Sequence, residues 1–335
     1  MTKLPLRIEV VRSNSKTLSS MSEASAKAIV STLQRHYTDV VLINVDNAID
    51  INALIARAPD LVFAGIHFVE NEAPLAGKVW LSDILDIHNI RYTGSIKGAH
   101  RLGLNKHLAK ERIAESGLKT SPFSIVRREG ESIMNKKDYS YPLFVKPSNK
   151  GGGQGIDEHS IVHNFEELES KTSMIHKVQK TDALIEQYLP GREFSVAVIT
   201  DQKSGHLVAM PIELVATKDT NGDRMLSHRV KVSNAEDVVE VTNLIDRSKL
   251  TDFAIAIFEA LGARDYGRID IRYDQEETPH FLEANLIPSL IDGYGSFPKA
   301  YALNLGLTYD DMLLQIVSLA MQRTPVEQLV QRQFS

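Results

Sequence analysis

Polar and apolar side chains alternate over residues 267–285, which read GRIDIRYDQEETPHFLEAN. Side chains two residues apart lie on the same face of a β-strand. If the two halves pair antiparallel through the acidic turn at 274–279, one face gathers Arg268, Asp270, Glu283 and Asn285. The other face, expected to pack into the core, carries Ile269, Ile271, Leu282 and Ala284.

This gathering of polar groups suggests a metal site. Two carboxylates held close together repel each other unless a cation lies between them. Oxygen ligands from two carboxylates and an amide suit Mg²⁺, and a neighbouring arginine suits a multiply charged transition state. A hairpin with a solvated polar face is the alternative, and it accounts for Arg272 and Gln275. It explains the Asn-Leu-Ile-Pro continuation less well, so we favour the metal site.

A glycine-rich loop follows a predicted strand at 141–147, with four glycines in five positions: Gly151, Gly152, Gly153 and Gly155. Such a loop lets backbone N–H groups close on an anion, and Lys146 adds a positive charge. It is not a Walker A loop, because no GK[ST] ends it. A flexible surface hairpin explains the glycines equally well.

Residues 183–200 predict two strands around Pro190-Gly191, forming a hairpin that carries Glu186 and Glu193. Acids seven residues apart across a turn can bind two polar groups of one ligand. Taken alone, however, the pair is better explained as two solvated edge charges.

The first hundred residues alternate strand-like and helix-like stretches, which predicts a doubly wound parallel sheet. Strands are expected at 6–11, 40–45 and 60–66, and helices at 22–36, 51–58 and 75–90. Further helices are expected at 104–118 and, as one or two segments, at 235–262. Ligands bind such sheets at the carboxyl ends of the strands, here 12–16 and 67–72. His67 lies at one of these ends, although a structural role is commoner for such a histidine.

Composition narrows the class of protein. With 335 residues, 43% of them hydrophobic, the chain is expected to form two or three domains. The net charge of −5 and the scattered basic residues argue against a nucleic-acid-binding surface. The absence of cysteine excludes disulfides and thiolate chemistry and fits a reducing compartment. Because no apolar stretch approaches the ~20 residues of a membrane span, we expect a soluble cytoplasmic protein.

Seven segments, in this order, resemble the ATP-grasp enzymes, and among them the D-alanine–D-alanine ligases. They are RYTGS, NKHLAKERIAESGL, PLFVKPSNKGGGQG, LIEQYLPGREFSVAV, YGRIDIRY, FLEAN and GLTYDDMLLQIVSLAMQR. The resemblance covers nearly the whole chain and implies an α/β ATP-grasp fold of three domains. These are an N-terminal α/β domain (1–100), a central subdomain with the glycine-rich loop (101–204) and a C-terminal subdomain with the metal site (205–335).

The resemblance also implies a nucleotide site for ATP. The residues it assigns to ATP are Lys106, Lys146, Gly151, Gly152, Gly153, Gly155, Glu186, Gln187, Leu189 and Glu193. In this assignment the two lysines contact the phosphates and the glycine loop closes over them. Glu186 meets the adenine amino group, the backbone at 187–189 reads the ring edge, and Glu193 holds the ribose hydroxyls.

The same resemblance implies two Mg²⁺ ions, for which Mn²⁺ can substitute, bound by Asp270, Glu283 and Asn285. Arg268 becomes the catalytic residue that stabilises the γ-phosphate and the acyl phosphate formed from it. The family commonly forms dimers, and apolar helices in the first hundred residues are candidates for such an interface.

Departures from the family pattern fall on the amino-acid subsites. Where the family has a glutamate four residues before a helix-opening serine, this chain has Leu18 before Ser22. The family's glycine-rich loop has the sequence G-S-S-V-G, whereas this chain has GGGQG at 151–155. The family's tyrosine-rich loop is absent from 212–230. The family motif N-T-x-P-G-M is replaced by NLIPSL at 285–290. The remaining candidates for substrate binding are His67, Glu72, Ser289 and Tyr294.

These departures spare the ATP and metal residues, so we expect an active ligase that joins a carboxylate to an amine. Its substrates are expected to differ from the usual pair, because Leu18 leaves a buried ammonium without a counter-ion. Three alternatives remain. The first is a genuine D-alanine–D-alanine ligase with substitute residues such as Arg12, Lys16, Arg224 or Tyr294. The others are a nucleotide-binding regulatory protein and a carboxylate kinase that stops at the acyl phosphate.

Overall fold

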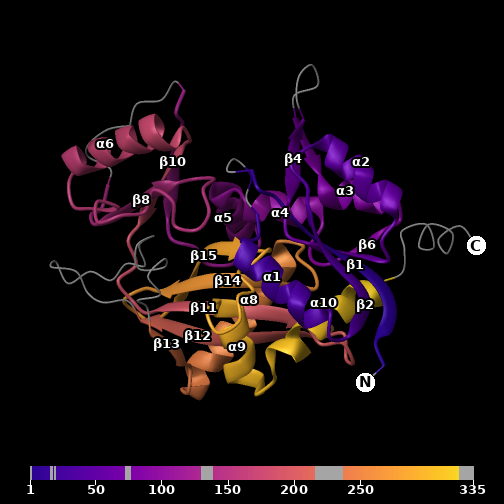
Figure 1. Ribbon diagram of the computed structural model, residues 1–335. Helices are drawn as coiled ribbons and strands as arrows, with labels where there is room; N and C mark the ends of the chain where they lie inside the picture. Colours follow the sequence, from indigo (N-terminus) through magenta and orange to yellow (C-terminus); the bar gives the residue numbers. More distant parts are fainter. Residues whose placement is uncertain are drawn as a thin grey trace, which may run out of the picture.

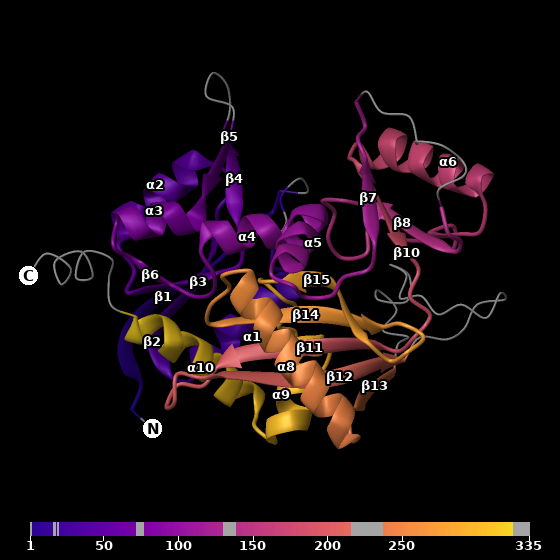
Figure 2. The ribbon, with the colours of Figure 1, turned by 180° about the vertical axis from the view of Figure 1, so that it is seen from behind.

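The computed structural model describes residues 2–15, 18, 20–71, 77–129, 139–215 and 237–323. Figures 1 and 2 show an N-terminal group of elements and a second group around α6 standing side by side above a large sheet. None of the helices in these ranges is long and apolar enough to cross a membrane.

The N-terminal sheet is parallel, as predicted, with strand order β2-β1-β3-β6. Its strands are β1 (Leu4–Arg12), β2 (Tyr37–Asn44), β3 (Leu61–Ala64) and β6 (Arg91–Tyr92). Helix α1 (Glu23–Leu33) packs on the face that carries Ile8 and Val10. Helices α2 (Ala48–Arg57) and α3 (Leu81–Ile87) pack on the face that carries Val11. Helices therefore cover both faces, which confirms the doubly wound arrangement.

The helix predicted over 75–90 is wrong in its first part. Residues 75 and 76 lie outside the described ranges, and β5 (Gly77–Trp80) is a strand that pairs antiparallel with β4 (Phe68–Asn71). Trp80 lies opposite Phe68, with ring centroids 5.2 Å apart. Such cross-strand aromatic pairs stabilise a hairpin, and helix α3 begins only at Leu81.

A second, antiparallel sheet has the order β7-β10-β8-β9. It consists of β7 (Phe123–Val126), β10 (Ala183–Gln187), β8 (Leu143–Pro147) and β9 (Ile161–Val162). Helix α6 (Phe165–Met174) and the π-helix η1 (Ile175–Gln179) pack against it through Leu168 and Ile175. Before this sheet come α4 (Lys97–Gly103) and α5 (Lys106–Glu115), the latter within the helix predicted at 104–118.

The large antiparallel sheet has the order β13-β12-β11-β14-β15. Its strands are β13 (Asp237–Glu240), β12 (Leu207–Val215), β11 (Glu193–Thr200), β14 (Tyr266–Tyr273) and β15 (Pro279–Asn285). Helix α8 (Leu244–Ala260) covers one face, and α9 (Ser296–Leu305) and α10 (Tyr309–Gln322) cover the other. Helix α10 also packs on α1, so one hydrophobic core joins this sheet to the N-terminal one.

The prediction of helix throughout 235–262 is wrong at its start. Residues 235 and 236 lie outside the described ranges, and 237–240 form β13, the edge strand beside β12. Helix α8 begins after Asn243, whose side chain accepts hydrogen bonds from the backbone N–H groups of Ile245 and Asp246. That cap separates the strand from the helix.

The predicted hairpin at 183–200 is also wrong, although both strands exist. β10 belongs to the second sheet and β11 to the large sheet, so the chain crosses between sheets at Pro190-Gly191. The N–H of Gly191 donates to the Tyr273 carbonyl at 3.1 Å. A Cβ at Gly191 would lie 2.4 Å from that oxygen, so the crossing needs glycine here. The boundaries of the three predicted domains remain a prediction.

Replacing Gly191 with alanine should destabilise the protein by about 1–3 kcal/mol, because the added methyl forces the two sheets apart. Denaturant unfolding followed by circular dichroism measures this loss. Gly98→Ala in α4 is the matched control, since nothing lies within 4 Å of a Cβ built there. A Gly191→Ala protein as stable as this control would contradict the tight crossing.

Candidate functional site

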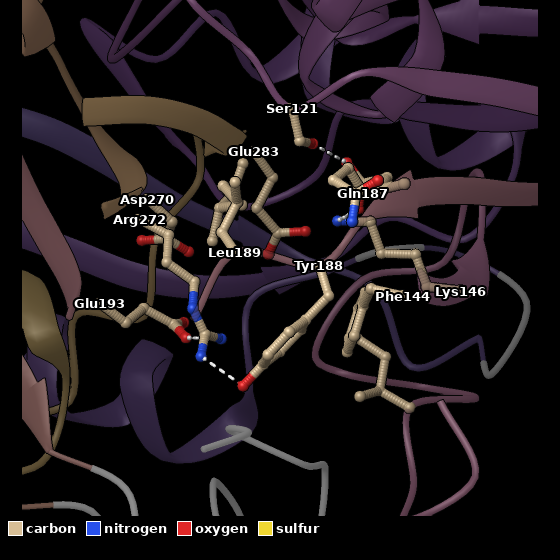
Figure 3. Close-up of a pocket in the computed structure, with 13 residues that line it drawn as sticks. Ser121, Phe144, Lys146, Gln187, Tyr188, Leu189, Glu193, Asp270, Arg272 and Glu283 are labelled. Carbon is tan, nitrogen blue, oxygen red and sulfur yellow. Dashed lines mark hydrogen bonds and ion pairs between the residues drawn. The ribbon is translucent and has the colours of Figure 1, made fainter. Parts of the chain in front are cut away.

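A pocket lies between the second sheet and the large sheet, as Figure 3 shows. It encloses about 610 Å³, including space open to solvent. Its lining residues are Ser121, Phe144, Lys146, Ile156, Glu186, Gln187, Tyr188, Leu189, Glu193, Asp270, Arg272, Leu282 and Glu283. Many of the residues assigned from sequence to ATP and metal therefore meet in one place.

Strands β14 and β15 pair antiparallel, which confirms the predicted convergence of polar groups. Asp270 lies opposite Glu283, and Arg268 lies opposite Asn285. The Asp270 carboxylate accepts two hydrogen bonds of 2.9 Å from Arg268 and one of 3.0 Å from the Ser195 hydroxyl. Two carboxylates thus face each other on neighbouring strands, and cationic side chains are held against them.

The expectation that Leu282 packs into the core is wrong. The β14–β15 register shifts between Asp270 and Ile271, so Phe281 pairs with Ile271 and is fully buried in the core. Leu282 instead lines the pocket. A bulge places two residues of one strand opposite one of the other, which shifts the alternation by one position.

Arg272 is the third member of the polar face of β14, and the alternative of a solvated hairpin face is wrong for this residue. It is buried and lines the pocket, where its guanidinium forms an ion pair with Glu193 at 3.2 Å. It also donates a 3.2 Å hydrogen bond to the Tyr188 hydroxyl, as Figure 3 shows. The signal was present, because Arg272 continues the two-residue spacing of Arg268 and Asp270.

Glu186 lines the pocket and lies between two lysines. Its carboxylate is 2.6 Å from Lys146 Nζ on β8 and 2.5 Å from Lys110 Nζ on α5. Burial opposes ionisation of Glu186, but the attraction of the two lysines outweighs it and lowers the pKa of the carboxyl. The same glutamate, with Glu283, raises the pKa of Lys146 against the opposing effect of burial. Lys110 had not been singled out from the sequence, although it follows Lys106 by one helical turn.

Lys106 and the glycine loop lie next to the pocket, outside its lining residues. Lys106 Nζ is 3.4 Å from a Glu283 oxygen and donates to the Lys150 carbonyl. Burial lowers the pKa of this lysine, partly countered by Glu283. Gly152 and Gly155 adopt φ of +62° and +76°, a region that favours glycine, so the loop backbone itself calls for glycine there.

The candidates for substrate binding are more dispersed. His67 is buried with its Nδ1 3.0 Å from His100 Nδ1, and burial holds its pKa well below the usual value. Ser289 and Tyr294 lie between β15 and α9, and Tyr294 is partly exposed. Glu72 lies outside the described residues, as do Lys16 and Arg224.

Leu18, which the resemblance aligns with the family's glutamate, packs against an apolar cluster of the N-terminal domain that includes Val11, Val45 and Leu54. The predicted helix-opening serine is confirmed, because the Ser22 side chain caps α1 by accepting from the Ser25 N–H.

Comparison with known proteins identifies the family. A family model described as the D-ala D-ala ligase C-terminus matches residues 113–318. This chain belongs to the D-alanine–D-alanine ligase family of ATP-grasp enzymes. That family consists of ATP-dependent ligases that form carbon–nitrogen bonds, as expected from the sequence.

Individual relatives are similar over most of this chain. A D-alanine–D-alanine ligase of Lacticaseibacillus casei is 29% identical over 266 residues, which cover 79% of this chain and 69% of the relative. An uncharacterised protein of Sinorhizobium fredii is 31% identical over 276 residues, covering 80% and 77%. The crystal structure of a Bacillus anthracis D-alanine–D-alanine ligase complexed with ATP is 19% identical with a TM-score of 0.73. That comparison covers 98% of this chain and 100% of the other and supports the fold.

The acidic groups of this family member fit a hard divalent cation. Among the described residues, no three or more His, Cys, Asp or Glu side chains gather as a metal site. The ligand set expected from the sequence has two carboxylates and the Asn285 amide, all oxygen donors of the kind that Mg²⁺ prefers. Because Asp270 and Glu283 face each other across two strands, a cation between them would relieve their repulsion.

Removing the charge of Arg272 should destabilise the protein, because Glu193 then loses a buried partner. We expect Arg272→Met to lower the free energy of unfolding by about 3 kcal/mol, measured by denaturant titration. The double variant Arg272→Met/Glu193→Gln should recover part of that loss. Arg112→Met, at an exposed arginine of α5, is the control. Equal stability of the Arg272→Met and control proteins would refute the structural role of this pair.

Proposed function

We propose that this protein is an ATP-dependent ligase that joins a carboxylate to an amine through an acyl phosphate, with a substrate pair other than two D-alanines. The observation that carries this proposal is a contrast within the molecule. The charged residues assigned to ATP and metal converge between two sheets and hold one another in place. Leu18, in contrast, presents an apolar group where the family has a carboxylate.

The pocket has the donors and acceptors that a nucleotide needs. Lys146 and Lys106 supply positive charge for phosphates at the end of β8 and the start of α5. Glu186 and the backbone at 187–189 are acceptors and donors for the adenine edge, with Phe144 and Leu189 as apolar neighbours. Glu193, oriented by Arg272, is suited to the ribose hydroxyls.

Asp270, Glu283 and Asn285 would hold Mg²⁺. When bound, Mg²⁺ would neutralise the charge that develops on the transferred phosphate. Arg268 lies beside these ligands and donates to Asp270 through two N–H groups. It is placed to fix the orientation of Asp270 and to add positive charge next to the phosphate.

The reaction proceeds in two displacements. A carboxylate oxygen of the first substrate attacks the γ-phosphorus of ATP, and the bond to the β,γ-bridging oxygen breaks to release ADP. The nitrogen of a neutral amine then attacks the acyl carbon, inorganic phosphate leaves, and the amine loses a proton to solvent. This chemistry depends on alignment and charge neutralisation, so no protein nucleophile is needed.

The first substrate is proposed to lack a buried ammonium at the subsite near Leu18. Placing an ammonium against this apolar cluster would cost free energy that no carboxylate from Leu18 offsets. Carboxylic acids without an α-amino group, or with that group acylated, satisfy this condition.

A second candidate function is D-alanine–D-alanine ligation itself, which the names of the Lacticaseibacillus and Bacillus relatives favour. It requires other residues to hold the substrate amine. Retention of ATP binding without ligation and arrest at the acyl phosphate are the two remaining outcomes, and a panel of substrates distinguishes them.

Glu283→Gln and Asp270→Asn should each reduce turnover by at least about 100-fold, because both remove a charged metal ligand. Steady-state ADP release, with Mg²⁺ varied, measures the effect, and circular dichroism verifies the fold. Glu276→Gln, at an exposed glutamate in the turn between β14 and β15, is the control. Ordinary turnover in the Glu283→Gln protein would show that the metal assignment is wrong.

The substrate proposal is tested by ADP release with ATP and Mg²⁺ across D- and L-amino acids, dipeptides and amine-free acids, with products identified by mass spectrometry. We expect D-alanine alone to be inactive and another acid and amine to be joined. Formation of D-alanyl-D-alanine at full rate would establish the second candidate function instead. ADP release with hydroxamate formation in hydroxylamine, but no amide, would indicate a carboxylate kinase. ATP binding without any ADP release would indicate a regulatory protein.

A further inference from the structure

Lys110 is a buried lysine that neither the resemblance nor the proposed mechanism uses. It lies on α5 one turn after Lys106, and its side chain is 0% exposed. The side chains of Lys106 and Lys146 are 8% and 5% exposed. Lys146 lines the pocket, whereas Lys110 lies behind the lining residues. A nucleotide in the pocket therefore cannot reach Lys110 directly.

The ammonium of Lys110 is surrounded by acceptors from separate segments. Its Nζ is 2.5 Å from Glu186 Oε1 and donates to the Thr120 hydroxyl at 2.7 Å. The Ser121 hydroxyl and the Phe281 carbonyl accept at 3.2 and 3.1 Å. These acceptors fix the position of the ammonium, because a shift toward one of them lengthens the contact with another.

Glu186 has one oxygen for each lysine. Lys110 binds Oε1 and Lys146 binds Oε2. With Oε1 held from behind, the plane of the carboxylate is fixed and Oε2 stays toward the pocket. Ser121 adds a contact to Oε1 at 3.3 Å. Without Lys110, one cation would face the glutamate, and Glu186 could rotate toward Lys146.

Lys110 also connects the two sheets that enclose the pocket. Glu186 belongs to β10 of the second sheet, and Phe281 belongs to β15 of the large sheet, two residues before Glu283. Thr120 reinforces this connection, because its hydroxyl donates to the same Phe281 carbonyl at 2.9 Å. The ammonium therefore sets Glu186 relative to the strand that carries Glu283.

We propose that Lys110 is a positioning residue for the nucleotide: it holds Glu186 ionised and oriented toward the adenine, so that nucleotide affinity depends on Lys110 without direct contact. This inference rests on the proposed nucleotide site. It assigns to Lys110 a role distinct from the phosphate contacts proposed for Lys106 and Lys146.

The charge of Lys110 is sensitive to pH in the neutral to alkaline range. Burial lowers the pKa of this ammonium to about 8, partly countered by Glu186, while Lys146 lowers it further and Glu283 raises it. As pH rises through this value, Lys110 loses its proton and Glu186 loses one of its two counter-ions. Nucleotide binding should therefore weaken above about pH 8, and Lys110→Arg should move that loss to higher pH.

The test measures the dissociation constant of a non-hydrolysable ATP analogue with Mg²⁺ by calorimetry, which needs no knowledge of the other substrates. The proteins compared are the wild type, Lys110→Met, Lys110→Arg, Glu186→Gln and Lys110→Met/Glu186→Gln. We expect Lys110→Met and Glu186→Gln each to weaken binding by about tenfold. Lys110→Arg should stay near the wild type at neutral pH.

The double variant decides the mechanism. If Lys110 acts through Glu186, then Lys110→Met has little further effect once Glu186 is Gln, so the double variant should match Glu186→Gln. A further tenfold loss in the double variant would overturn the inference and leave the proposed function intact. The double variant is compared with Glu186→Gln, and both proteins lack the buried glutamate charge. The comparison therefore remains valid even if Lys110→Met alone folds poorly. If the wild type does not bind the analogue, the proposed function itself is wrong.

Discussion

The site depends on the need to balance two carboxylates that face each other on neighbouring strands, Asp270 and Glu283. The backbone pairing of β14 and β15 fixes their positions, so the repulsion cannot be relieved by moving them apart. Positive charge has to be brought to them instead. Arg268 supplies it to Asp270 from the same strand, and Lys106 approaches Glu283 from the first turn of α5. The location of α5 beside β15 is therefore tied to the chemistry of the strands.

The pocket exists because two separate sheets are kept at a fixed spacing. One tie is the Gly191 N–H, which donates to the Tyr273 carbonyl where the chain crosses from β10 to β11. A second tie is the contact of the 119–121 segment with Phe281, where the Phe281 N–H donates to the Lys119 carbonyl at 3.0 Å. Lys110 adds a charge-assisted hydrogen bond to the Phe281 carbonyl at this second tie. Charges on opposite sides of the pocket can then be matched, because the distance between them is set by the backbone.

The sequence predicted the elements whose periodicity is local, and it missed features that depend on partners distant in the chain. Alternation alone placed Arg268, Asp270, Glu283 and Asn285 on one face. It could not show the bulge that turns Leu282 into the pocket, because a bulge is a property of the paired strands. The local pattern predicts helix at 77–80 and 237–240, because the pairing of these segments with β4 and β12 is not visible in it. The two-residue spacing of β14 predicts that Arg272 shares a face with Arg268 and Asp270. Its burial, however, depends on Glu193 and Tyr188 from other segments.

The two sides of the site differ in how freely they can change. On the nucleotide side, each charged group is held by another: Glu186 by Lys110 and Lys146, and Glu193 by Arg272. A single substitution there removes a counter-ion from a buried charge, which costs up to several kcal/mol. Leu18 packs against an apolar cluster that contains none of these charged residues. Under the proposed function, a change at this position would alter which substrate group is tolerated, while the charge balance at the proposed ATP and metal site would stay intact. Under the proposed function, such independence would allow one nucleotide-activating framework to serve ligases with different acids and amines.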